Sequence, residues 1–246
     1  MLYCSLLFSF LLPVLLFPEY LRYSEDMLLM YLWVGASFFI ILAVLFYYYS
    51  KQLLAKNMNL GYLLTLIPMV MAGVYLAMIN GVFVVLVDDY WFYFARFIGW
   101  FIVSPIAVYI VCLVTFKKTA LSKDKTWIAA ILFSMVPIAF GALAIFSYDV
   151  GRVLALCMGS IGLILFLYLA LLRFPEHIKK KTKELYNCLA ALLGVVGTIY
   201  FVVAILTEPG LALISVETEI GIYAFLDIFS VGLLGYLIFV RSNLVT

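Results

Sequence analysis

The chain of 246 residues is 68% hydrophobic and 11% charged, whereas about 25% of the residues of an ordinary soluble domain are charged. Its mean hydropathy of +1.22 leaves too few polar side chains to cover a water-facing surface. The composition therefore excludes a soluble enzyme, a nucleic-acid-binding protein and a disordered chain, and it predicts an integral membrane protein. The net charge of +2 is informative only through its distribution along the chain.

The N-terminal segment, residues 1–24, is apolar and carries Pro13 within an uncharged stretch. One interpretation is a signal-like segment, although a basic start and a small-residue cleavage site are missing. The other, which we favour, is a retained membrane helix that is kinked at the proline and crosses the bilayer fully or in part. Both interpretations place a boundary after residue 24 and predict one membrane domain over residues 25–246.

Seven apolar runs follow this segment, and each is long enough to cross a bilayer as a helix. None alternates apolar and polar residues with a period of two, so helices are favoured over the strands of a membrane barrel. We predict an all-α bundle of seven transmembrane helices, at Met27–Ser50, Gly61–Val87, Trp91–Phe116, Trp127–Tyr148, Gly151–Arg173, Leu185–Leu206 and Ile220–Val240.

The connections between these runs differ in charge on the two sides of the predicted bundle. Those on one side carry twelve basic and three acidic residues, and those on the other carry two basic and nine acidic residues. Because short cytoplasmic connections are enriched in lysine and arginine, the basic side is expected to face the cytoplasm. The first of the seven helices then begins outside, and the C-terminus is cytoplasmic.

Two ionisable residues, Arg96 and Asp227, lie well inside the predicted helices, at similar depths from the outer side. Charges at such positions are costly, and they usually face the bundle interior and pair with one another. We therefore expect a buried Arg96–Asp227 ion pair, formed directly or through one water, with Tyr75 donating a hydrogen bond to Asp227. The pair fits either a neutralised structural contact or part of a proton or ion relay.

The third run contains Arg96-Phe-Ile-Gly-Trp100 followed by Pro105, and it resembles the third helix of the microbial rhodopsins. That helix carries the signature Arg-aromatic-x-Asp-Trp-x-x-x-Thr-Pro. The second run, with Pro68 and Tyr75, is similar to the family's second helix. The resemblance implies an opsin-like bundle in the plasma membrane of a prokaryote-like cell.

The last run is similar to the family's seventh helix, because Glu219 precedes Asp227 by eight residues. Glu208, in Thr-Glu-Pro-Gly, resembles a second outer glutamate of the family. The resemblance thus extends from Glu25 to Arg241. It suggests a buried polar network of Arg96, Asp227, Tyr75, Glu208 and Glu219.

The departures from the family pattern concern the chromophore. The lysine that carries retinal as a Schiff base in the rhodopsins corresponds to Val231, and all ten lysines lie in predicted connections. The carboxylate that accepts the Schiff-base proton corresponds to Gly99, and the proton donor corresponds to Ile110. The resemblance therefore implies a bundle without covalent retinal.

The sixth helix of the family contains Trp-x-x-Tyr-Pro-x-x-Trp, which we align with Leu193, Val196, Gly197 and Tyr200. The candidate pocket is lined by Trp100, Leu193, Tyr200 and Val231. Because Gly99, Leu193 and Val231 are smaller than their family counterparts, we expect either a cavity or an inward movement of helices.

The sequence contains no catalytic motif, and its four cysteines stand singly, so we expect neither an enzyme nor a metal site. The first functional hypothesis is an accessory subunit of a membrane complex, with lipids and other membrane subunits or a second copy as partners and no nucleic acid. The alternatives are a non-covalent binder or sensor of a carotenoid, quinone or lipid, and a passive proton or ion pathway.

Overall fold

The computed structural model describes residues 25–54, 57–87, 90–117, 125–207, 211 and 213–241. It contains seven helices that are long and apolar enough to cross a membrane. They are α2 (Glu25–Leu53), α3 (Met58–Ile79), α4 (Phe94–Thr115), α6 (Thr126–Ile145), α7 (Asp149–Tyr168), α8 (Lys183–Leu206) and α9 (Val216–Val240). The predicted all-α, seven-helix fold of an integral membrane protein is confirmed. The apolar segment 1–24 lies outside the described residues.

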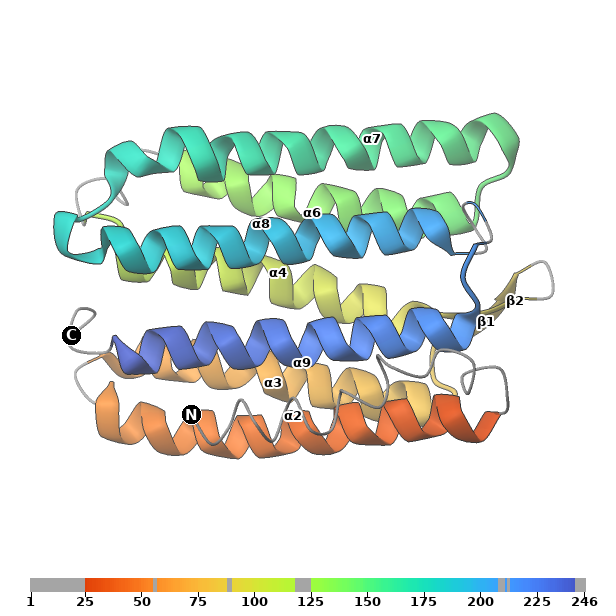
Figure 1. The fold of residues 1–246 in the computed structure, drawn as a ribbon, viewed down its shortest axis with the longest axis horizontal. Helices are drawn as coiled ribbons and strands as arrows, with labels where there is room; N and C mark the ends of the chain where they lie inside the picture. Colours follow the sequence, from red (N-terminus) through yellow and green to blue (C-terminus); the bar gives the residue numbers. More distant parts are fainter. Residues whose placement is uncertain are drawn as a thin grey trace.

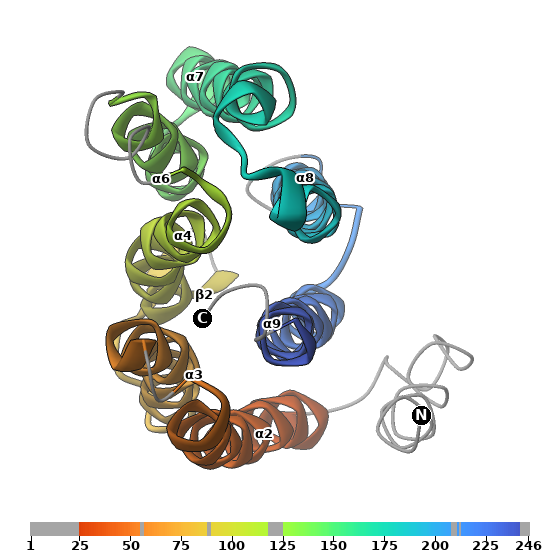
Figure 2. The ribbon, with the colours of Figure 1, turned by 90° about the vertical axis from the view of Figure 1, so that its left-hand side faces the viewer.

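The helices run side by side with their long axes roughly parallel (Figure 1). Viewed along these axes, α2, α3, α4, α6 and α7 form a curved row, and α8 and α9 complete the ring (Figure 2). Successive helices alternate in direction, so α4 and α9 both begin at the end of the bundle that carries a β-hairpin. We call this end the hairpin end.

Glycines allow several of these helices to approach closely. An added Cβ at Gly162 in α7 would lie 2.6 Å from the Cβ of Val136 in α6, and one at Gly235 in α9 would collide with the ring of Phe46 in α2. Between lipid-exposed helices the hydrophobic effect gives little driving force, so close packing at small residues contributes much of the association. The glycines thereby hold α6 to α7 and α9 to α2.

The predicted second helix, which extended to Val87, is too long. Helix α3 ends at Ile79, and Gly81 adopts a left-handed conformation with φ of +68°. The chain then forms an antiparallel hairpin of β1 (Val84–Val87) and β2 (Tyr90–Tyr93). Glycine tolerates the left-handed conformation that ends the helix, and the β-branched and aromatic residues beyond it favour strands.

The opposite end of the bundle, which we call the basic end, carries most of the lysines. The chain leaves α7 through a short π-helix, η3 (Leu169–Arg173), and two short 3-10 helices, η4 (Phe174–His177) and η5 (Lys180–Thr182). The hydroxyl of Thr182 donates a hydrogen bond of 3.1 Å to the carbonyl oxygen of Thr115, which ties this connection to α4. That the basic end faces the cytoplasm stays a prediction.

Candidate functional site

Arg96 and Glu219 form a buried ion pair near the hairpin end. Arg96 is the third residue of α4 and Glu219 the fourth of α9, so both lie within about 5 Å of the start of their helices along the axis. The Nη1 atom of Arg96 is 3.5 Å from Oε1 of Glu219, and the two side chains are 2% and 8% exposed. The guanidinium also lies over the ring of Tyr223, with 4.7 Å between Cζ and the ring centroid.

The predicted ion pair between Arg96 and Asp227 is not formed directly, since Arg96 pairs with Glu219, and its form through one water stays a prediction. Asp227 lies eleven residues into α9, so it is about 12 Å deeper along the helix than Glu219. The sequence-based estimate of depth erred because α4 begins at Phe94 rather than Trp91, and α9 begins at Val216 rather than Ile220. The two shifts bring Glu219, instead of Asp227, to the level of Arg96.

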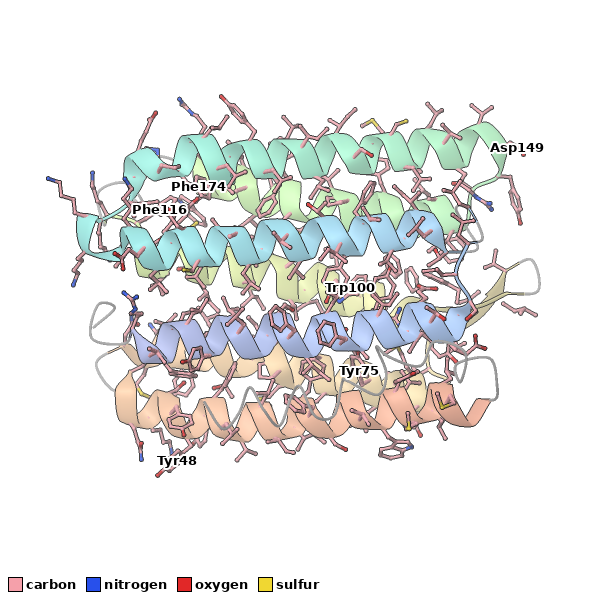
Figure 3. The ribbon with its side chains drawn as sticks, in the orientation of Figure 1. Tyr48, Tyr75, Trp100, Phe116, Asp149 and Phe174 are labelled. Carbon is pink, nitrogen blue, oxygen red and sulfur yellow. The ribbon has the colours of Figure 1, made fainter. Side chains whose placement is uncertain are left out.

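Asp227 accepts three hydrogen bonds from neutral side chains at the centre of the bundle. The Tyr75 hydroxyl donates to Oδ2 at 2.7 Å, the Trp100 indole N–H donates to Oδ1 at 2.9 Å, and the Tyr200 hydroxyl also donates to Oδ1. Figure 3 shows Tyr75 and Trp100 near the middle of the bundle, beside α9. The hydrogen bond from Tyr75 was predicted from the sequence, and those from Trp100 and Tyr200 were not.

The ring of Tyr75 packs directly against Gly35 of α2. A Cβ at position 35 would collide with the ring of Tyr75, so only glycine leaves room for this tyrosine. The Tyr75 side chain is fully buried, and its ring also contacts Phe39 with 5.4 Å between centroids. Helix α2 therefore positions the donor to Asp227 although it contributes no polar group to the cluster.

An aromatic layer separates the Arg96–Glu219 pair from Asp227. The ring centroid of Tyr223 lies 4.9 Å from that of Trp100 and 5.5 Å from that of Tyr200. Residues four apart share a helix face, so α9 presents one row of side chains to these layers. The row consists of Glu219, Tyr223, Asp227 and Val231.

Beyond Asp227 lies a cavity of about 160 Å³ between α3, α4, α6, α7, α8 and α9. Its lining includes the four residues expected for the pocket, namely Trp100, Leu193, Tyr200 and Val231. Asp227 is the one carboxylate among the described lining residues, and no lysine is among them. Most other lining side chains are apolar; the exceptions are the hydroxyls of Ser104, Ser134, Ser230 and Tyr200 and the indole N–H of Trp100.

The position that resembles the family's third-helix carboxylate is closed by packing. A Cβ at Gly99 would lie 2.6 Å from the Cγ2 atom of Val74 in α3. Ile110, at the position of the proton donor, is fully buried among apolar side chains. Position 99 has no room for a carboxylate without movement of its neighbours, and position 110 offers a carboxylate only apolar surroundings.

Tyr200 both lines the cavity, as predicted, and donates a hydrogen bond from its hydroxyl to Asp227. The alignment of α8 with the family pattern stays a prediction. Gly197 and Ala204 of the same helix also line the cavity, and a Cβ at Gly197 would meet only Leu163, at 3.9 Å.

Some predicted site residues lie elsewhere or are not described. Glu208 is outside the described residues, so its place in the network stays a prediction. Glu219 is separated from Asp227 by the aromatic layer and does not share its hydrogen bonds. In the described part of the chain, no three histidine, cysteine or acidic residues are grouped to hold a metal ion.

Comparison with known proteins gives consistent matches over the helical bundle. The model of the family described as bacteriorhodopsin-like protein matches residues 26–242. A curated "Bacteriorhodopsin-II-like protein" from Haloquadratum walsbyi is 27% identical over 214 residues, which cover 80% of this chain and 83% of that protein.

Solved structures of low sequence identity share the fold. The thermophilic rhodopsin from Rubrobacter xylanophilus superposes with a TM-score of 0.80 and 22% identity, over 89% of this chain and 97% of that one. The light-driven proton pump from Coccomyxa subellipsoidea gives a TM-score of 0.75 and 22% identity, over 89% and 98% of the two chains.

Proposed function

Because this chain belongs to the bacteriorhodopsin-like family and its central cavity is lined by no described lysine, we propose that it binds a small, mostly hydrocarbon molecule there without a covalent bond. The observation that carries the proposal is the cavity itself, which borders Val231 one helical turn beyond Asp227. A Schiff base needs an amine, and valine offers none. The protein is then a non-photoactive membrane protein and not a light-driven pump.

The packing at Gly99 supports this proposal. Val74 occupies the space into which a carboxylate at position 99 would extend, so the surroundings have adapted to the missing group. A pump damaged at one position would keep room for the lost side chain. Instead, Asp227 accepts hydrogen bonds from donors on α3, α4 and α8.

The cavity volume limits the size of the guest. An engineered apolar cavity of about 150 Å³ holds benzene, whereas drug-sized molecules occupy pockets of about 300–1,000 Å³. At about 160 Å³ the cavity accommodates a molecule of benzene size or the end of a lipid chain. A whole carotenoid or quinone fits only if side chains or helices move apart.

The structure supports the other two functional hypotheses less well. An accessory subunit needs no internal cavity, so we now place cavity binding ahead of the accessory role. That role stays a prediction, and co-purification of a stoichiometric partner would test it. An ion pathway needs polar groups along its length. Towards the basic end of the cavity, the lining is mostly apolar, with residues such as Val108, Phe166 and Leu234.

Filling the cavity tests the proposal. Gly197→Phe places a ring of benzene size into the void, so it is expected to abolish binding of fluorobenzene and to raise the unfolding temperature. A smaller part of the gain, about 0.5 kcal/mol, comes from replacing a glycine in a helix interior. Binding is measured by fluorine NMR on delipidated protein in detergent.

Gly73→Phe is the matched control, because this glycine lies on the lipid-facing side of α3 and an added Cβ meets nothing within 4 Å. It introduces the same ring without touching the cavity, and saturable fluorobenzene binding should persist. Equal binding by the wild type and Gly197→Phe would contradict the proposal.

A further inference from the structure

The buried charges of the described bundle do not balance. The charged side chains that are buried in it are Arg96, Glu219 and Asp227, one guanidinium against two carboxylates. Arg96 forms its ion pair with Glu219, so no described cation lies within 4.0 Å of the Asp227 carboxylate. The buried carboxyl group that has no described cation within 4.0 Å is therefore Asp227, on the wall of the cavity.

The three hydrogen bonds to Asp227 orient its carboxyl group but bring no opposite charge to it. Their donors are two phenol hydroxyls and an indole N–H, all neutral. A buried carboxylate is costly unless an opposite charge lies close to it. The face of Asp227 toward the hairpin end is covered by the aromatic layer, so the space left for a cation is the cavity.

We propose that the guest is a small aliphatic amine in its ammonium form, with its head at Asp227 and its hydrocarbon part among the apolar lining. This inference rests on the proposed function and adds the charge of the ligand. The hydroxyl oxygens of Ser104 and Ser230 also line the cavity and are acceptors for further N–H groups. A bare metal ion is disfavoured, because one carboxylate in an apolar cavity is a poor replacement for its water shell.

The test compares hexylamine, which is protonated at pH 7.5, with 1-hexanol, which has the same chain and no charge. Thermal unfolding of delipidated protein in an uncharged detergent is measured against the concentration of each. Hexylamine is expected to stabilise the wild type with at least a tenfold lower half-saturating concentration than hexanol. This preference should disappear in Asp227→Asn and persist in Glu176→Gln, which alters an exposed carboxylate outside the bundle.

A second variant keeps the test decisive if Asp227→Asn fails to fold. Val231→Lys supplies an ammonium four residues from Asp227 on the same face of α9, so it should fold and lose its response to hexylamine. Equal stabilisation by hexanol and hexylamine would overturn the charge inference and leave cavity binding intact. If hexanol, hexylamine and fluorobenzene all fail to bind the wild type, the proposed function is overturned as well.

Discussion

Arg96→Gln is expected to lower the free energy of unfolding by about 3–5 kcal/mol, because it removes the guanidinium that faces the buried carboxylate of Glu219. Glu219→Gln should cost a similar amount, since it leaves the buried guanidinium facing a neutral amide. The double variant should cost clearly less than the sum of the two, because neither charge then remains. The measurement is denaturant unfolding in mixed micelles.

Asp227→Asn serves as the control in the same experiment. The structure places Trp100 and Tyr223 between Asp227 and Arg96, so the coupling of Arg96→Gln to Asp227→Asn should be smaller than its coupling to Glu219→Gln. A larger coupling of Arg96 to Asp227 than to Glu219 would contradict the pairing seen here. It would favour the pair that the sequence alone had suggested.

Gly99→Asp is expected to destabilise the bundle by more than about 3 kcal/mol, through overpacking and a buried carboxylate. The Cβ alone would lie 2.6 Å from Cγ2 of Val74, which belongs to the neighbouring helix. Gly99→Ala isolates the steric part and should cost about 1–3 kcal/mol.

Val74→Ala in the Gly99→Asp background removes the colliding methyl groups and should restore part of the stability. The same denaturant unfolding compares all four proteins. If Gly99→Asp were as stable as the wild type, α3 and α4 would be able to move apart at this point at little cost. That result would contradict the inference that the packing around position 99 has adapted to the missing carboxylate.

Most of the fold could be predicted from the sequence, because a bilayer admits few solutions. Runs of about 20 apolar residues give the helices their number and approximate extent. The hairpin of residues 84–93 was missed, since Val84–Val87 is as apolar as the helix before it. Asn80-Gly81 was the available signal, because this dipeptide is typical of a helix end followed by a turn.

The polar cluster was harder to predict, because pairing depends on depth to within one helical turn. The end of an apolar run locates the start of a helix only to within a few residues. That uncertainty led to the prediction of Asp227, instead of Glu219, as the partner of Arg96. Ser215 caps α9, and its hydroxyl oxygen accepts the N–H of Thr218 at 3.4 Å. A serine before the run is a start signal that would have placed Glu219 inside the helix.

The most direct test of the missing covalent chromophore is incubation with all-trans retinal. The purified protein is mixed with retinal in the dark, and its absorption spectrum is recorded before and after denaturation. With Val231 in the cavity wall and no described lysine lining it, we expect only the spectrum of free retinal and no adduct by mass spectrometry. A visible band that survives denaturation as a retinal–protein adduct would contradict the account.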